Sequence, residues 1–250
     1  MTKHIHGGDV YKYDHCLDFS ANCNPLGTPK SVKQAIIDSV EDLSDYPRVG
    51  CGPLKEAIAD YEHTKEYLIC GNGAADLIFS LSRALNPKKA LLPAPTFAEY
   101  EQALVSVGCE ISRYYLKEEN DFCIQKDYPD VLKREKPDII FLCNPNNPTG
   151  ITIPQDLLEE ILETCAMQGI FMVVDECFLD FVKDPEKHTL KEKLAKYPGL
   201  FILKAFTKRY AIPGVRLGYG FCSDGEVLDR MEAVTQPWNV STMAQQAGMA

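Results

Sequence analysis

The sequence predicts an α/β fold in which helices cover both faces of a mostly parallel β-sheet. Short apolar runs alternate along the chain with longer runs whose apolar residues recur at helical spacing. The short runs are apolar almost throughout, which is typical of strands that are buried on both faces. Glycine, proline and asparagine stand between the runs, where they favour turns. We therefore expect ligands to bind at the carboxyl ends of the strands.

Composition and charge narrow the class of protein. The chain has 250 residues, of which 45% are hydrophobic and 25% charged, as in ordinary globular domains. No cluster of Lys and Arg offsets the net charge of −10, so we expect neither nucleic acid nor an anionic membrane as a partner. No apolar run has the length of a membrane span, and the first residues lack the apolar core of a signal peptide.

Ten cysteines are scattered along the chain, and no two of them form a CxxC pair. They stand singly, many of them in apolar surroundings, which indicates buried free thiols in a reducing cytoplasm rather than disulfides. The same scatter offers no zinc-binding pattern, so we expect no metal site.

The first part of the chain is predicted to be irregular and then to form two helices. Residues 1–30 contain several turn-forming pairs. A helix follows over 31–43, with Ser31 as its N-cap candidate, and a second helix covers 53–62 after a loop over 45–53.

From residue 70 onward, strands and helices are predicted to alternate. A glycine-containing turn opens the first helix of this part, over 70–85. Buried strands are expected at 89–95, 109–116, 137–145, 170–176, 200–206 and 216–223, and helices at 97–108, 129–135, 154–169, 189–198 and 224–234.

A lysine and an arginine flank a Pro-Gly turn late in the chain. Lys208 follows the apolar run 200–203, and Arg216 stands where the next strand begins. A lysine that is desolvated at the end of a strand becomes a nucleophilic amine, and arginine offers a planar fork that fits a phosphate. Such a pair could hold pyridoxal phosphate (PLP) as a Schiff base, although a solvated lysine and a strand-edge arginine would leave the same pattern.

Asp175 stands at the end of another apolar run, 170–174. A carboxylate at the tip of a buried strand is costly unless it has a partner. Asp175 could cap the next turn, or it could pair with the protonated pyridine nitrogen of PLP and so make the ring an electron sink.

Three further segments carry candidate ligand-binding residues. The turn 71–75 opens a helix whose free N–H groups form an anion site. The sequence of this turn nearly fits the glycine-rich fingerprint of dinucleotide-binding proteins, but Asp76 replaces the third glycine. Asn147 follows a strand and could donate to a phenolate oxygen or only form a turn. Phe97 could stack on an aromatic ring or belong to the core.

Taken together, and in their order along the chain, the segments that carry these candidate residues resemble the motifs of the fold-type I PLP enzymes, in the aminotransferase class I/II group. The resemblance runs from about residue 6 to the last residue and rests on GNGAADLI, APTFAEY, CNPNNPTG, VVDECFLDF and TKRYAIPGVRLGYG. It implies a PLP-binding large domain over 41–235, an N-terminal arm with part of a small domain over 1–40, and the start of an interdomain helix over 236–250. Family members continue for on the order of 100 more residues, so the C-terminal small domain is expected to be missing from this chain.

The resemblance implies a role for each candidate residue. Lys208 matches the Schiff-base lysine, and Asp175 matches the partner of the pyridine nitrogen. Asn147 matches the donor to the 3-oxygen of the ring, and Phe97 the aromatic residue that stacks on the ring. Tyr46 matches a tyrosine that reaches the cofactor phosphate of the neighbouring subunit, which implies a homodimer. The phosphate site is matched by Gly73, Ala74, Ala75, Thr207 and Arg216.

Two departures from the family pattern concern this phosphate site. Ala205 stands where the family usually has Ser or Thr, which removes one hydrogen bond to a charged group, worth roughly 1.5–3 kcal/mol of cofactor affinity. Ala75 replaces a more usual Thr or Ser.

Within the family, the chain resembles the threonine-phosphate decarboxylases of cobalamin biosynthesis, through the segments HGGDVY and DFSANCNPLG, the stretch AIPGVRLGYG and Phe178. That resemblance implies PLP-dependent decarboxylation of L-threonine O-3-phosphate. A histidinol-phosphate or other class I/II aminotransferase is the alternative, and a PLP-binding fragment without turnover is a third. We predict that His6, Asn22 and Asn24 help to hold a small phosphorylated amino acid, although a turn-rich arm that merely packs would look the same.

Overall fold

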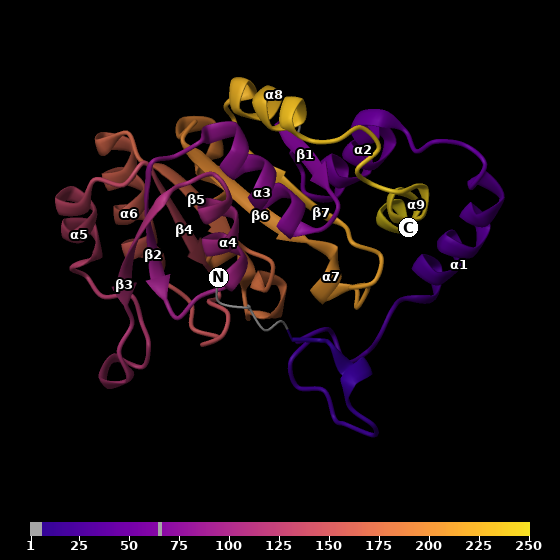
Figure 1. The fold of residues 1–250 in the computed structure, drawn as a ribbon, viewed down its shortest axis with the longest axis horizontal. Helices are drawn as coiled ribbons and strands as arrows, with labels where there is room; N and C mark the ends of the chain where they lie inside the picture. Colours follow the sequence, from indigo (N-terminus) through magenta and orange to yellow (C-terminus); the bar gives the residue numbers. More distant parts are fainter. Residues whose placement is uncertain (1–6, 65–66) are drawn as a thin grey trace.

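The computed structural model describes residues 7–64 and 67–250; residues 1–6, among them His6, and residues 65–66 lie outside the described part. Figure 1 shows a sheet with helices on both sides of it. Within the described ranges, the strands of this sheet are β1 (Leu68–Gly71), β2 (Lys89–Ala94), β3 (Glu110–Tyr115), β4 (Ile139–Cys143), β5 (Phe171–Asp175), β6 (Leu200–Ala205) and β7 (Gly218–Phe221).

The sheet is mostly parallel, which confirms the predicted fold class. Its strand order is β1-β7-β6-β5-β4-β2-β3. β2 runs parallel to β3 and β4, and β5 runs parallel to β4 and β6, whereas β7 is antiparallel to both β6 and β1. The chain leaves β6 at Ala205 and re-enters the sheet directly opposite, at Gly218, so these two strands can only run antiparallel.

Helices cover both faces of the sheet, and each face has its own apolar core. Within the described part of the chain, no helix combines the length and the apolar character needed to cross a membrane. One face is covered by α3 (Ala74–Leu85), α4 (Ala98–Ser106) and α8 (Gly225–Val234). The other face is covered by α2 (Gly52–Tyr61), α5 (Tyr128–Glu135), α6 (Gln155–Gln168) and α9 (Thr242–Met249). Helix α1 (Lys30–Asp38) packs against α9, and the short α7 (Phe206–Arg209) follows β6.

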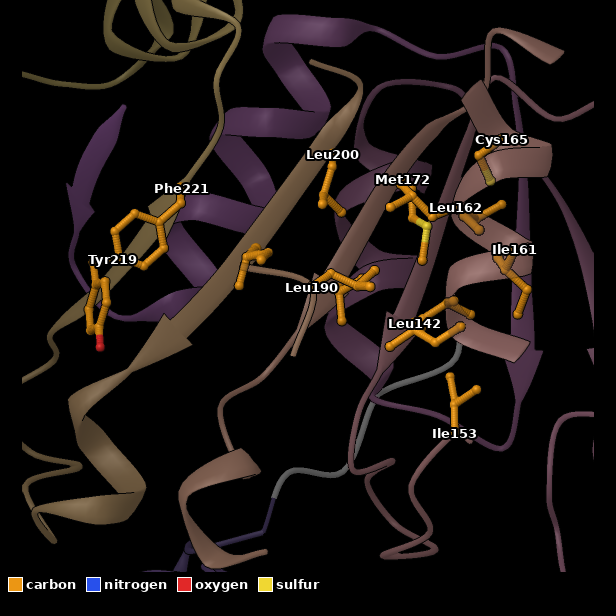
Figure 2. Close-up of a cluster of buried hydrophobic side chains, with 14 of the residues drawn as sticks. Leu142, Ile153, Ile161, Leu162, Cys165, Met172, Leu190, Leu200, Tyr219 and Phe221 are labelled. Atoms are coloured by element: carbon orange, nitrogen blue, oxygen red, sulfur yellow. The ribbon is translucent and has the colours of Figure 1, made fainter. Parts of the chain in front are cut away.

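Figure 2 shows the core between the sheet and α6. Leu142 of β4, Met172 of β5 and Leu200 of β6 are fully buried. They pack in one cluster with Ile161 and Leu162 of α6. Each buried side chain of this size stabilises the fold by roughly 1.5–3 kcal/mol. The core therefore fixes the strands relative to one another, and with them the carboxyl ends that carry the predicted site.

Several elements differ from the sequence prediction, among them α7, a short helix where the pattern predicts none. The sequence pattern does not predict β1, because the strand is only four residues long and leads straight into a glycine-containing turn. The helix predicted over 31–43 ends at Asp38 and continues as a 3₁₀ turn over Ser39–Asp42. The helix predicted over 189–198 is a 3₁₀ segment, Lys191–Lys196, because the preceding residues bend to hydrogen-bond the buried carboxylate of Glu176.

A buried carboxylate joins the end of α2 to the sheet. Glu62 is 5% exposed and accepts hydrogen bonds from Lys191 Nζ at 2.9 Å, Lys204 Nζ at 3.0 Å and Tyr219 Oη at 2.6 Å. Burial acts to raise the pKa of Glu62, but the charge of Lys204 and the three donors outweigh it and lower this pKa to about 2.

We expect Glu62→Gln to destabilise the protein at pH 7 by about 3 kcal/mol, and by progressively less in acid. The pKa of the folded state lies below the ordinary value of 4.5, so the ionised carboxyl stabilises the fold above that pH and loses its effect as the pH falls toward 2. Thermal unfolding of both proteins from pH 7 to pH 3 measures this difference. Glu159→Gln, which breaks the more exposed Glu159–Lys193 pair, should change stability little. A difference between Glu62→Gln and the parent protein that stays constant with pH would contradict the prediction.

Candidate active site

A cavity of about 650 Å³ lies at the carboxyl ends of three neighbouring strands. Its wall includes Cys143, Asp175 and Ala205, the last residues of β4, β5 and β6. Parts of the N-terminal arm, residues 7–28, form another side. The cavity thus lies where the sequence predicts a ligand. Of the predicted site residues, its wall contains Asn22, Ala74, Ala75, Phe97, Asn147, Asp175, Thr207, Lys208 and Arg216.

Lys208 lies in α7, the short helix directly after β6. Its Nζ donates to the carbonyl oxygen of Ala21 at 2.6 Å and lies 5.5 Å from the centre of the Phe178 ring. Both of these residues belong to the cavity wall. The amine is therefore half-buried at the cavity, in a position to react with a carbonyl group bound there.

Asp175 provides a buried carboxylate on the same wall. It is 4% exposed; its Oδ2 accepts from Tyr100 Oη at 2.6 Å and its Oδ1 from the backbone N–H of Cys177 at 2.9 Å. Burial raises the pKa of Asp175, while these donors and the charge of Lys208 oppose the rise. A carboxylate in this setting gains most from a positively charged partner, such as a protonated pyridine nitrogen.

The start of α3 and Arg216 form a cradle for an anion. Gly73 precedes the helix with a φ of 82°. A Cβ on Gly73 would lie 2.5 Å from Nη2 of Arg216, and a Cβ on Gly218 would lie 2.5 Å from the backbone nitrogen of Ala74. Both positions therefore need glycine for the arginine and β7 to approach the helix so closely. The helix N-terminus and the guanidinium together suit a phosphate group.

The loops that carry Phe97 and Asn147 are tied together by a residue that sequence reasoning missed. Asn146 donates to the carbonyl oxygen of Pro95 at 3.1 Å and accepts from Thr96 Oγ1 at 2.9 Å. Phe97 and Asn147 both belong to the cavity wall, where one offers an aromatic face and the other an amide. The tie holds these two groups on one side of the cavity.

Tyr100 is a second residue that sequence reasoning missed. It is fully buried, stacks on Phe141 with 4.9 Å between ring centres, and donates to Asp175. The available signal was its place in APTFAEY, three residues after Phe97 and thus on the same side of the helix. Its hydroxyl fixes the orientation of the Asp175 carboxylate.

Of the predicted site residues that the structure describes, three lie outside the cavity wall: Gly73, which belongs to the cradle beside it, Tyr46 and Asn24. Tyr46 is 77% exposed and stacks on Trp238 with 4.5 Å between ring centres. Asn24 uses its side-chain amide within the protein, where it donates to the carbonyl oxygen of Arg209 and accepts from the backbone N–H of Leu26. The predicted role of Tyr46 concerns a neighbouring subunit and stays a prediction.

An amine, a buried carboxylate, an anion cradle and an aromatic side chain thus surround one cavity. The donor set fits PLP, since the cradle suits its phosphate, Lys208 its aldehyde and Asp175 its ring nitrogen. Fold and site together define a PLP enzyme of fold type I.

Comparisons with known proteins agree with this class. The family model "Aminotransferase class I and II" matches residues 14–250. The chain is 37% identical to a threonine-phosphate decarboxylase of Salmonella typhimurium and 39% identical to a putative one of Caldanaerobacter subterraneus, covering 97% and 99% of this chain and 68% and 67% of those proteins. A solved histidinol-phosphate aminotransferase of Clostridium acetobutylicum is 33% identical with a TM-score of 0.85, over 94% of this chain and 68% of that one. The chain belongs to the class I and II aminotransferase family, whose cofactor is PLP.

We expect Gly73→Ala to weaken PLP binding roughly tenfold, because the substitution combines a clash with backbone strain of about 1–3 kcal/mol. The new Cβ would meet the guanidinium of Arg216 and push it out of the phosphate cradle. Gly169→Ala is the matched control, since Gly169 also has a positive φ, of 68°, but a Cβ there meets no described atom within 4 Å. Titration with PLP, followed by absorbance, should separate the two variants; equal affinities would contradict the proposed cradle.

Proposed function

We propose that this protein decarboxylates L-threonine O-3-phosphate to (R)-1-amino-2-propanol O-2-phosphate, a reaction of cobalamin biosynthesis. The observation that carries the proposal is its likeness, at 37% and 39% identity, to two proteins named for this reaction. Phe178 in the cavity wall supports it, because a phenylalanine cannot donate a hydrogen bond to the cofactor as the tyrosine of most aminotransferases does.

The residues of the cavity would share the work as follows. Bound PLP supplies a sink for the electron pair that is released when a bond to the substrate Cα breaks. Lys208 would hold the cofactor through its amine and could carry a proton to the substrate Cα. Asp175 would keep the ring nitrogen protonated, Asn147 would donate to the 3-oxygen and Phe97 would stack on the ring. The phosphate is held by Arg216, Thr207 and the N–H groups of Gly73, Ala74 and Ala75.

Substrate orientation decides which bond breaks. With PLP bound, the residues that orient the substrate would decide which bond to Cα stands perpendicular to the ring, and a carboxylate held there would leave as carbon dioxide. A Cα–H bond held there would lead to transamination instead. We propose that His6 and Asn22 help to hold the substrate's phosphate and carboxylate, with Asn22 already in the cavity wall.

An aminotransferase acting on histidinol phosphate or another amino acid is the second candidate. It is favoured by the match to the solved histidinol-phosphate aminotransferase, which shares both the fold and 33% of the aligned residues. The third candidate is a protein that binds PLP without turnover. The chain spans about two thirds of the length of the curated relatives it matches.

We further propose a homodimer in the cytoplasm. Four large apolar side chains of the arm are almost fully exposed: Tyr11 at 96%, Leu17 at 85%, Phe19 at 87% and Leu26 at 90%. Together with Tyr46 they provide the kind of apolar surface that a second copy would cover. Free cysteines throughout the described residues suit a reducing compartment.

Incubation with PLP and O-phospho-L-threonine tests the proposed reaction. We expect release of carbon dioxide without any 2-oxo acid, measured by trapping the gas and detecting the amino alcohol phosphate. Turnover that strictly requires a 2-oxo acid would refute decarboxylation and favour an aminotransferase. Bound PLP without either activity would leave the third candidate.

A further inference from the structure

The N-terminal arm is fastened to the turn that carries Lys208. The backbone N–H of Asn24 donates to the carbonyl oxygen of Lys208 at 2.9 Å, and Asn24 Nδ2 donates to that of Arg209 at 2.9 Å. The carbonyl oxygen of Ala21 accepts from Lys208 Nζ at 2.6 Å. One short segment of the arm thus contacts both ends of Lys208, its backbone and its amine.

Asn24 is held in place by its own turn. Its Oδ1 accepts from the backbone N–H of Leu26 at 3.0 Å, and its carbonyl oxygen accepts from that of Gly27 at 3.1 Å. A side-chain acceptor for the turn and a side-chain donor for Arg209 are both required at this position, and the short amide of asparagine supplies both. These contacts explain why Asn24 faces the lysine-bearing turn rather than the cavity.

The turn needs such support because α7 is only four residues long. The last carbonyl groups of a helix have no partners within it. Within the turn, the carbonyl oxygen of Lys208 accepts from the N–H of Tyr210 and, at 3.4 Å, from that of Ala211. The bond from Asn24, at 2.9 Å, is shorter than the bond from Ala211 and comes from outside the turn. A small shift of this backbone would displace the amine, and reactions between bound groups are sensitive to displacements of about 1 Å.

We propose that Asn24 is a positioning residue for Lys208, and that the Ala21 carbonyl holds the lysine amine whenever its bond to the cofactor is open. The inference rests on the proposed function, in which Lys208 binds PLP. To form that bond, the deprotonated amine attacks the aldehyde carbon, and a C=N bond replaces C=O with loss of one water molecule. Because Ala21 holds the amine and Asn24 holds the backbone of the same lysine, the amine lies at one fixed position at the cavity before it reacts.

Asn24→Asp tests this role while keeping the turn intact. The substitution preserves the acceptor for Leu26 but replaces the donor to Arg209 with an oxygen that faces another oxygen. We expect imine formation, followed as visible absorption after PLP is added to cofactor-free protein, to slow about five- to tenfold. Thr28→Val is the matched control, because it removes a 2.7 Å bond from the same arm to the carbonyl oxygen of Ala211 and spares Lys208 and Arg209.

Thermal unfolding of the cofactor-free variants separates positioning from general loosening of the arm. The expected result is that both variants lower Tm by similar amounts, while only Asn24→Asp slows imine formation. An unchanged rate in Asn24→Asp, or an equal slowing in Thr28→Val, would overturn the proposal. Absence of any visible absorption in the parent protein with PLP would refute the proposed function, and with it the inference.

Discussion

Lys208→Ala should abolish the visible imine absorption of the protein with PLP and lower turnover on the order of 10⁴-fold or more. Within the described wall of the cavity, Lys208 is the one lysine, and its amine is aimed by the Ala21 carbonyl. Neither bond formation with the aldehyde nor proton transfer at Cα has another described amine to use. The variant should still fold, because the side chain contributes little to either core.

The spectrum and the site of the bond check this result. Borohydride reduction of the parent protein with PLP should attach the cofactor to the peptide that contains Lys208, as seen by mass spectrometry. Lys196→Ala is a suitable control, since Lys196 is exposed and lies beside the Tyr197 ring, outside the cavity wall. Visible absorption that persists in Lys208→Ala, with label on another lysine, would remove the basis of the assignment.

The central strands could be predicted from the sequence because both faces of the sheet are covered. Every residue of β4 is buried, so its apolar run carries a signal that does not depend on which neighbour it meets. Gly169 marked the end of α6 for a local reason as well, since the helix ends there in a left-handed turn. β1 escaped prediction because it is only four residues long and leads straight into a glycine-containing turn, so no apolar run marks it.

Site residues could be predicted where they stand at or just after the end of a strand, because neighbouring parallel strands bring their carboxyl ends to the same edge of the sheet. Asp175 ends β5 and Lys208 follows β6, and these two strands are adjacent in the sheet. Contacts made by single side chains across the fold left no such signal. The Tyr100–Asp175 bond joins residues 75 positions apart, and the Asn24–Arg209 bond joins residues 185 positions apart. No local periodicity reports such a contact, so the sequence could not predict that the Asn24 amide bonds to the lysine-bearing turn.

Asp175→Asn should lower turnover about 10²–10³-fold while leaving the fold intact. Asparagine has nearly the same shape: its one oxygen can accept from the N–H of Cys177, and the Tyr100 hydroxyl can turn to accept from its amide N–H. It removes the negative charge that would keep a ring nitrogen protonated, so the ring would accept electrons less readily. Because the wall and its lysine are unchanged, PLP should still bind and give a visible imine absorption, shifted in its dependence on pH.

Glu176→Gln separates the effect of that charge from the effect of losing any buried acid. Glu176 directly follows Asp175, is 1% exposed and faces the other side of the sheet, where Thr189 Oγ1 donates to it at 2.8 Å. Burial raises its pKa to about 7, so replacing it should leave turnover near that of the parent and stabilise the protein above neutral pH, where the ionised carboxyl costs stability. Equal losses of turnover in Asp175→Asn and Glu176→Gln would mean that the strand end needs any buried acid, and a role for Asp175 at the ring nitrogen would be refuted. A loss confined to Asp175→Asn ties turnover to the carboxylate that faces the cavity.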